Sequence, residues 1–416
     1  MSAVIGTVIG SGIFFKSEEI LNITDGNILS GLLVFAVGGA IMLLCAASFA
    51  LLSGESGSRG GVVGYAEKMC GSGFARFAAL FSADFYLPSM TATLAYVSGG
   101  YFCELLGLGG SEVLRVAFSG MLLVLFFAAN TLTPEAAGRF QVVSAVLKLL
   151  PLLAVGAVGC VALAEKGVEM VRTAGMGASF LPALLSSAFA YEGWIAVTAL
   201  GGDVKNAKRN MPIALVLGSL AVLAVYVLYY LGVVGVSESG SSTAAFERLF
   251  GGGGRRVMTA FVTVSCLGAL NGLTMSVVRG HYVLSEFLSV RRRGGGLFGE
   301  ISERTGIPVL SGIMGLLVSE LWLFYKAVAS ILPWSGFDPA EASISVMYGI
   351  YIPIFVMMTV KLRGMSRLKR YALPTAAALA ACVVAFAAPV AFGWTMAVFV
   401  IGVAAIAGAV LFIYRR

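Results

Sequence analysis

Long apolar segments separated by short polar gaps constrain the fold of this chain more than any other feature. A transmembrane helix needs about 20 largely apolar residues, and twelve segments of about that length can be placed along the 416 residues. Only 12% of the residues are charged, and they gather between these segments, which excludes a water-soluble globule. We therefore predict an all-α polytopic membrane protein with twelve transmembrane helices and no soluble domain. The predicted helices lie near residues 2–21, 27–53, 73–102, 112–132, 140–164, 180–201, 211–236, 256–288, 308–329, 342–361, 371–389 and 393–414.

The distribution of Lys and Arg predicts the orientation of the chain, because cytoplasmic loops carry the excess of these residues. Counted on alternate sides, 19 of the 28 basic residues fall on the side of the N-terminus and 8 on the other, with Lys148 left inside a helix. We therefore expect both termini in the cytoplasm and a multi-pass protein of the cell inner (plasma) membrane. The run Arg291 to Arg293 would help to fix this topology. The net charge of +7 does not indicate nucleic acid, because no segment can form a soluble basic face.

Two predicted helices carry a break at mid-length. The first reads VIGTVIGSGIFF, with three glycines in seven residues, and the sixth reads SSAFAYEGWIAV, with Glu192 and Gly193 at its centre. Glycine destabilises a helix interior by about 1 kcal/mol relative to alanine, and unwound backbone at membrane depth persists only where it lines a cavity or is buried in protein. Close packing of two membrane helices also uses small residues and is the alternative for Gly10 to Gly12. Glu192 favours a functional site, because an acid is costly at bilayer depth.

Breaks in the first and sixth of twelve helices fit two inverted five-helix repeats, with discontinuous helices 1 and 6, followed by two C-terminal helices. The first repeat would span residues 1–164, the second 180–361 and the last two helices 371–414, within a single transmembrane domain of residues 1–416. Interrupted helices at corresponding positions of two halves indicate the binding site of a secondary transporter. Free N–H groups at the positive end of a half-helix suit a carboxylate, and free carbonyls suit an ammonium. The pattern predicts a site for a small zwitterion such as an amino acid.

An ordered set of motifs resembles the amino acid/polyamine/organocation (APC) superfamily of permeases, and within it prokaryotic-style members of the L-type amino acid transporter-like branch. The first-helix motif GTVIGSGIF (6–14) and the sixth-helix motif AFAYEGW (188–194) carry the resemblance. It extends over nearly the whole chain through VLKLLPLL (146–153), GDVKNAKRNMPIAL (202–215) and ALNG (269–272). The resemblance implies amino acid transport by alternating access.

The resemblance also implies which residues hold the substrate. Its carboxylate would lie against the backbone and hydroxyl of Ser11 and Gly12, and its ammonium would meet carbonyls of Val8 and of residues 189–192. Phe189 would cover the substrate as an aromatic gate, although a phenylalanine in the core or facing lipid is the alternative. The substrate-binding residues implied in this way are Thr7, Val8, Ser11, Gly12, Phe189, Ala190, Tyr191, Glu192 and Gly193.

Lys148 lies in the middle of the fifth predicted helix, where a lysine is costly unless it faces a polar cavity or a partner. In sodium-coupled relatives of this fold, Na⁺ bridges helices 1 and 8, and in the L-type-like branch a helix-five lysine is thought to supply that charge instead. The resemblance therefore implies sodium-independent transport, with Lys148 tying Ser11 to helix 8 near Asn271 as a surrogate for the sodium site. A structural lysine without a coupling role is the alternative.

The remaining reactive side chains favour neither a cofactor nor an enzyme. The six cysteines include no closely spaced pair, and a single histidine, His281, cannot form a metal site. We therefore expect no cofactor, no metal and no enzymatic activity, since a membrane enzyme needs clustered catalytic groups. A channel would need a ring of like groups, which this chain does not supply. Asp84 and Glu320 lie within predicted helices but match no motif, and we interpret them as structural or peripheral.

The loops and the N-terminus give further expectations. No accessory glycoprotein subunit is expected, because Cys103, near the region where mammalian members of the L-type group attach one, lies in the apolar run YFCELLG. We expect a monomer or weak homodimer in the lipid bilayer.

The N-terminus has no basic segment typical of a removable signal peptide. The first helix is about a turn short at its inner end, so that either the true start lies upstream or the inner gate is less well sealed. Gly201-Gly202-Asp203 and Asn206-Ala207 replace the acidic residues and Asn-Pro of the family, which puts an inner gate built on the missing acid in doubt.

These observations predict a secondary transporter of small or neutral L-amino acids that works without sodium, by exchange or by facilitated transport. The alternative is a proton-coupled permease for amines, polyamines or cationic amino acids, with Glu192 facing a cationic substrate. Capture of a carboxylate by unwound backbone favours α-amino acids over amines.

Overall fold

The computed structural model describes the chain except for residues 57–59, 167–179, 203, 238, 289–296, 333–336, 363 and 416. Arg291 to Arg293 and Asp203, on which two of the sequence predictions depend, lie outside the described residues. Within the described residues every regular element is helical. In chain order the elements are α1 (Ser2–Val8), α2 (Gly12–Ile23), α3 (Ile28–Ser56), α4 (Val62–Cys70), α5 (Ser72–Leu80), the π-helix η1 (Phe81–Tyr86), α6 (Leu87–Leu105), α7 (Glu112–Leu132), α8 (Pro134–Lys166), α9 (Phe180–Ala190), the 3₁₀ helix η3 (Ala196–Gly202), α10 (Ala207–Ser237), α11 (Ser242–Phe250), the 3₁₀ helix η4 (Gly251–Gly253), α12 (Gly254–Val277), α13 (Gly280–Leu288), the 3₁₀ helix η5 (Leu297–Gly299), α14 (Val309–Ile331), α15 (Pro339–Lys361), the π-helix η6 (Leu368–Ala372), α16 (Leu373–Phe392) and α17 (Trp394–Arg415).

Eight helical stretches among the described residues are long and apolar enough to cross a membrane. The chain is therefore an all-helical, polytopic protein, and the arrangement of twelve transmembrane helices stays a prediction. The first and sixth predicted helices divide into short pieces, and the π-helix Phe81–Tyr86 divides the third. The twelfth contributes only the shorter apolar stretch Trp394–Val410. The division into two inverted repeats stays a prediction.

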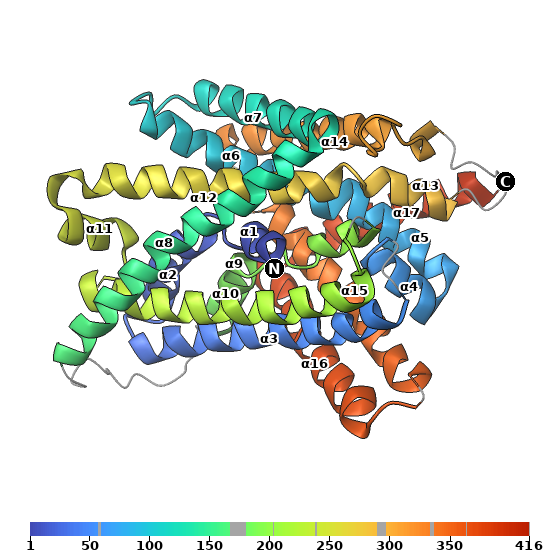
Figure 1. Cartoon of the computed structure of the whole chain (residues 1–416), viewed down its shortest axis with the longest axis horizontal. Coiled ribbons are helices and arrows are strands. Elements are labelled where there is room, and N and C mark those ends of the chain that lie inside the picture. The colour runs from blue at the N-terminus through green and yellow to red at the C-terminus, as the bar shows by residue number, and fades with distance from the viewer. Residues whose placement is uncertain are drawn as a thin grey trace.

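The long helices α3, α10 and α12 run along the long axis of the molecule, with α8 crossing them obliquely (Figure 1). α10 packs against both α3 and α8, and α12 packs against α6 and α8. The short helix α1 lies near the middle of the bundle, where α8, α10 and α12 all contact it. The broken first helix is thus enclosed by three long helices.

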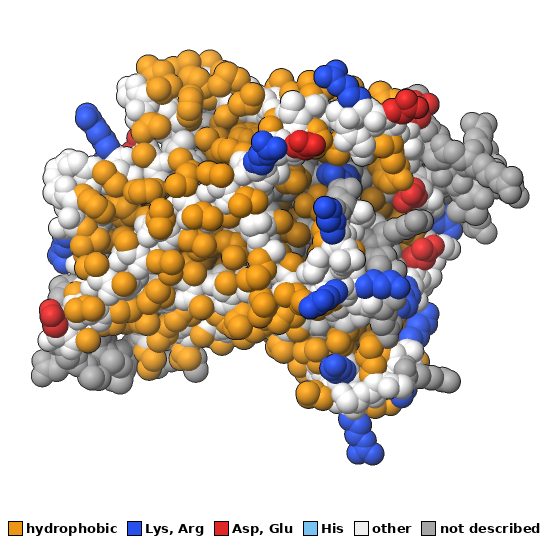
Figure 2. All heavy atoms as spheres, in the orientation of Figure 1, with side chains coloured by type: hydrophobic (Ala, Val, Ile, Leu, Met, Phe, Trp, Pro, Cys, Tyr) orange, Lys and Arg blue, Asp and Glu red, His pale blue; other side chains and the backbone are white. Residues whose placement is uncertain are grey.

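The outer surface matches a membrane environment. Apolar side chains cover most of the face drawn in Figure 2, whereas Lys and Arg gather toward the end that carries α4, α5 and α13. On α8, Val146 and Leu150 are each 57% exposed, while Lys148 is completely buried. α8 therefore presents an apolar face outward and points its one mid-helix charge into the bundle, as the cost of a lysine in lipid requires.

Candidate functional site

The first helix is interrupted between Val8 and Gly12, where Ser265 of α12 contacts it. α1 ends at Val8, Ile9 is extended (φ −74°, ψ 97°), and α2 begins at Gly12 with Ser11 as an N-cap that makes no side-chain capping bond. Three successive residues between the two pieces are non-helical, so backbone groups that a continuous helix would pair internally need other partners. The glycine-rich sequence permits this local unwinding because glycine has weak helix propensity.

The sixth helix is interrupted beside the first. α9 ends at Ala190, turns follow, and the chain resumes as the 3₁₀ helix η3. Gly193 has a φ of +106°, which strongly favours glycine. A Cβ atom at Gly193 would lie 3.2 Å from the Thr7 carbonyl oxygen, and one at Gly12 would lie 3.1 Å from the Ala190 Cα atom. The two unwound segments are therefore in direct backbone contact.

Lys148 supplies donors to the unwound backbone of the first helix. Its Nζ donates to the Gly6 carbonyl at 2.8 Å, to the Ile9 carbonyl and to the Ser265 carbonyl at 3.1 Å. An ammonium has three donors, and all three are used. The expectation that Lys148 ties Ser11 to helix 8 near Asn271 is therefore wrong in its contacts. Lys148 does join helix 1 to α12, but through backbone carbonyls.

Asn271 belongs to a separate buried polar cluster. Its Nδ2 donates to Gln141 Oε1 at 2.8 Å and to the Ala137 carbonyl at 3.0 Å, and its Oδ1 accepts from Asn130 Nδ2 at 3.0 Å. These bonds join α7, α8 and α12. Asn271 thus helps to fix α8 and α12, which both contact α1.

Two residues that the sequence did not single out form hydrogen bonds with the carbonyls of the interrupted helices. The Ser265 hydroxyl donates to the Gly10 carbonyl at 3.0 Å. The Tyr226 hydroxyl lies 3.1 Å from both the Val8 carbonyl and the Ala190 carbonyl, so it bridges the two interruptions. Since a hydroxyl has one proton, it can donate to only one of them at a time. No local signal identified either residue, because each stands within an ordinary helical sequence and meets its partner only in the fold.

Glu192 is a buried acid surrounded by hydroxyl groups. It is 3% exposed, it accepts a hydrogen bond from the Tyr86 hydroxyl, and Tyr348 and Tyr351 also face its carboxylate. Oε2 has no hydrogen-bond partner. Among the described residues no Lys, Arg or His forms an ion pair with Glu192, so the carboxylate has room for a further donor.

The other expected substrate-binding residues fall into two groups. Val8, Ser11, Gly12, Ala190 and Gly193 line the junction of the two breaks. The Thr7 hydroxyl turns back to the Ala3 carbonyl at 2.7 Å, and the Tyr191 hydroxyl donates to the Phe35 carbonyl of α3 at 2.9 Å. Tyr191 therefore points away from the junction, into the core between α3 and α10. Phe189 is partly exposed, and the Lys16 ammonium lies 5.6 Å from its ring centroid.

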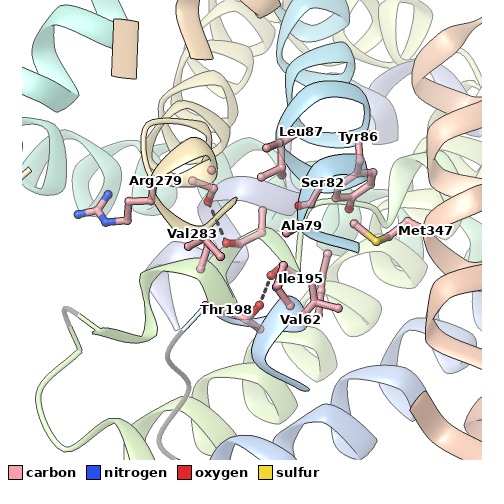
Figure 3. Close-up of a pocket in the computed structure, with 17 residues that line it drawn as sticks. Val62, Ala79, Ser82, Tyr86, Leu87, Ile195, Thr198, Arg279, Val283 and Met347 are labelled. Carbon is pink, nitrogen blue, oxygen red and sulfur yellow. Dashed lines mark hydrogen bonds between the residues drawn. The ribbon is translucent and has the colours of Figure 1, made fainter. Parts of the chain in front are cut away.

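A narrow cavity lies beside the sixth-helix break, between α4, η1, η3, α12, α13 and α15 (Figure 3). Its volume is about 30 Å³, which is room for about one water molecule. Ser276 donates to the Ala196 carbonyl at 2.9 Å, and Thr198 donates to the Ile195 carbonyl at 2.7 Å, so the wall on the η3 side is held by hydrogen bonds. Tyr86, the partner of Glu192, lines the cavity. The cavity is too small for an amino acid.

Two further acids lie within predicted membrane helices, and their surroundings differ. Asp84 Oδ1 lies 2.9 Å from His281 Nε2, and Trp322 Nε1 donates to the Asp84 carbonyl at 2.8 Å. Glu320 Oε1 is buried without a partner. Among the described residues there is no group of three or more His, Cys, Asp or Glu side chains that could hold a metal ion.

Comparisons with known proteins give the family. A family model described as "Amino acid permease" matches residues 1–414. The chain is 30% identical over 300 residues to the serine/threonine exchanger SteT of Bacillus subtilis, covering 69% of this chain and 66% of that protein. It is 24% identical over 389 residues to the human b(0,+)-type amino acid transporter 1 (86% and 79% covered) and 25% identical over 303 residues to the human cystine/glutamate transporter (68% and 59% covered). The chain therefore belongs to the amino acid permease family, within the APC superfamily.

Proposed function

We propose that this chain is a secondary transporter that exchanges small or neutral L-amino acids across the plasma membrane by alternating access, without sodium. The observation that carries the proposal is the backbone contact between two interrupted helices, where the Val8 and Ala190 carbonyls converge on one hydroxyl at 3.1 Å. The named relatives are transporters or exchangers of amino acids. We also propose that it works without an accessory subunit, as a monomer or weak homodimer, with both termini in the cytoplasm.

The junction offers complementary groups for a zwitterion. The first turn of α2 has N–H groups that the Ser11 side chain does not cap, and the positive end of that helix favours a carboxylate. The Val8 and Ala190 carbonyls now share Tyr226, and each keeps a lone pair for an ammonium. A substrate that carries an ammonium and a carboxylate on the same carbon atom would bridge the two breaks. We propose that the other expected residues at the junction, Ser11, Gly12 and Gly193, also bind the substrate through their backbone groups.

Lys148 supports a mechanism without sodium. Its fixed positive charge joins the Gly6 and Ile9 carbonyls of helix 1 to Ser265 on α12. A cation in that place would make the same kind of contact, with carbonyl oxygens as ligands. We propose that the two repeats, residues 1–164 and 180–361, rock against each other about this link while α16 and α17 stay outside the moving core.

Exchange in proteoliposomes tests the proposed function. Labelled L-serine or L-threonine is expected to enter several-fold faster when unlabelled amino acid is trapped inside, because the loaded carrier returns more readily than the empty one. Replacing external sodium by choline should leave the rate unchanged. Protein-free liposomes are the control. The absence of uptake across a panel of twenty amino acids would contradict the proposal.

Glu192 is the one observation that favours a second candidate, a proton-coupled permease for amines or cationic amino acids. Its carboxylate lies among tyrosine hydroxyls and forms no ion pair with a described Lys, Arg or His, and an acid without a basic partner at this depth could carry a proton or meet a cation. The carbonyl junction favours the amino acid exchanger, because an amine without a carboxylate would leave the α2 N-terminus unused.

Replacing Glu192 by glutamine separates the two candidates. Glutamine keeps an acceptor for the Tyr86 hydroxyl and removes the charge. If the chain is an amino acid exchanger, we expect the rate of neutral amino acid exchange in this variant to stay within about threefold of wild type. The rate should also not depend on an imposed pH gradient. Glu320→Gln, which alters another intramembrane acid with an unpartnered oxygen, is the matched control. Loss of exchange in Glu192→Gln alone, together with uptake driven by an acidic outside, would favour the proton-coupled permease.

A further inference from the structure

Two cavities lie where α6 turns into α7, at the end of the bundle opposite α4, α5 and α13 (Figure 1). Their volumes are about 270 Å³ and about 260 Å³, so each has room for several water molecules. Gly100, Glu104 and Arg115 line both cavities. Because they share these residues, we treat them as one polar groove and call it the α6–α7 groove.

Arg115 holds unused donors at this groove. Its Nη1 donates to the Tyr96 hydroxyl at 3.2 Å and lies 3.5 Å from Glu112 Oε2. A Cβ atom at Gly100 would lie 3.0 Å from Arg115 Nε and 3.4 Å from its Nη2, so these two nitrogens face the surface of α6 that lines the groove. Neither donates to an acceptor among the described residues. The guanidinium is therefore fixed through Nη1 and keeps N–H groups for an anion.

Glu104 supplies the opposite charge. It is exposed, and no side chain in the described part of the chain pairs with its carboxylate. The charges of Glu104 and Arg115 both act on the Tyr101 hydroxyl, so they lie near each other. Glu112, in contrast, accepts from the Ser330 hydroxyl at 3.0 Å and pairs with Arg115. The α6–α7 groove thus offers one free acid and one cation with spare donors, which suits a zwitterion.

The surroundings of the groove are apolar. α6 and α7 form one edge of the bundle in Figure 1, and apolar side chains cover that edge in Figure 2. Four large apolar side chains beside the groove are between 44% and 78% exposed: Leu105, Leu106, Leu108 and Val113. A soluble zwitterion would leave these side chains uncovered. A phospholipid can place its headgroup in the groove and its acyl chains on the apolar surface.

We propose that the α6–α7 groove binds the headgroup of phosphatidylethanolamine, with Arg115 on the phosphate and Glu104 on the ammonium. An anionic headgroup such as phosphatidylglycerol would bring a second negative charge to Glu104 and offer it no cation. Phosphatidylcholine carries a cation but no N–H donor for the carboxylate. The inference does not depend on amino acid transport, because lipid binding can be measured without substrate.

The experiment is native mass spectrometry of the purified full chain in detergent, with equal amounts of phosphatidylethanolamine and phosphatidylglycerol that carry the same acyl chains. Wild type is expected to retain phosphatidylethanolamine about fivefold over phosphatidylglycerol, which is the size of effect that one partly exposed charge contact can give. Glu104→Gln and Arg115→Gln should each abolish this preference. Should Arg115→Gln fail to fold, because Arg115 joins α6 to α7, Glu104→Gln decides, since Glu104 has no partner to lose.

Arg255→Gln is the matched control. Arg255 pairs with Glu247 at 3.6 Å and is 67% exposed, it falls on the same predicted side of the membrane as Arg115, and it does not line the groove. This variant should keep the preference for phosphatidylethanolamine. Equal retention of the two lipids by wild type, or an unchanged preference in folded Glu104→Gln, would overturn the proposal.

Competition with soluble molecules identifies the source of the zwitterion. An excess of L-serine, which has an ammonium and a carboxylate but no acyl chains, is expected to leave the bound phosphatidylethanolamine in place. Displacement of the lipid by L-serine in wild type would assign the groove to a free zwitterion and would contradict a lipid site. Retention of the lipid in excess L-serine, together with its loss in Glu104→Gln, would support the headgroup as the occupant.

Discussion

Replacing Lys148 by methionine is expected to reduce amino acid exchange by at least about 100-fold. Methionine fills a similar volume but removes all three donors, so the Gly6, Ile9 and Ser265 carbonyls lose their charged partner. Hydrogen bonds to charged groups contribute about 1.5–3 kcal/mol each, and loss of even one is enough to disturb the geometry of the unwound segment. The Ser265 hydroxyl lies 3.3 Å from the Ile9 carbonyl and 3.0 Å from the Gly10 carbonyl, but its one proton can serve only one of them at a time.

The measurement is exchange in proteoliposomes, normalised to protein that elutes as a single gel-filtration peak. Arg139→Met is the control, because Arg139 is an exposed cation on the same helix, α8. It should exchange at the wild-type rate. Lys148→Arg should not rescue activity, since a Cβ atom at Gly268 would already lie 3.1 Å from Lys148 Nζ and the larger guanidinium has little room. Wild-type exchange by a folded Lys148→Met variant would contradict the coupling role.

The sequence could predict the features that depend on local residue patterns: the membrane helices, their two interruptions and the buried lysine. Apolar length identifies membrane helices such as α3 and α10, because each crossing must bury or expose its own apolar surface. The two interruptions follow from Gly10 and Gly12 in one helix and Gly193 in the other, because these residues weaken a helix wherever they stand. Lys148 was identifiable because a lysine in an apolar helix must find a partner.

The features that could not be predicted depend on contacts between distant segments. Tyr226 and Ser265 meet helix 1 from positions more than 200 residues away in the chain, and their own helices carry no sign of it. The partners of Lys148 were misassigned for the same reason, since the rotation of α8 and α12 about their axes decides which groups face each other. The motif also did not show that the Tyr191 ring packs against Phe35 and Tyr226.

The sequence does not show where a predicted membrane helix is irregular. A window of apolar residues does not distinguish a continuous helix from one divided by a π-turn, and Phe81–Tyr86 forms such a turn within the third predicted span. π-Helical turns occur often at functional sites, and this one carries Tyr86 toward Glu192 and Asp84 toward His281. This irregular turn thus brings Tyr86 to the buried Glu192 and the partly exposed Asp84 to His281.

Replacing Gly193 by alanine is the second change with a large expected effect. A φ of +106° is strained for any residue with a Cβ atom, at a cost of about 1–2 kcal/mol. The new methyl group would also lie 3.2 Å from both the Thr7 carbonyl oxygen and Thr7 Cγ2. Both effects push the sixth-helix break away from the first, so exchange is expected to fall at least about tenfold.

Gly71→Ala isolates the backbone strain from the contact. Gly71 has a φ of +93°, close to that of Gly193, but a Cβ atom there would have no neighbour within 4 Å. It should lower the melting temperature while the KM for exchange stays unchanged, whereas Gly193→Ala should raise the KM as well, because only Gly193 lies against the backbone that would hold the substrate. Equal effects of the two variants on the KM would mean that strain alone matters and that contact between the breaks is not required for binding. A selective effect at Gly193 would locate the substrate where the two interrupted helices touch.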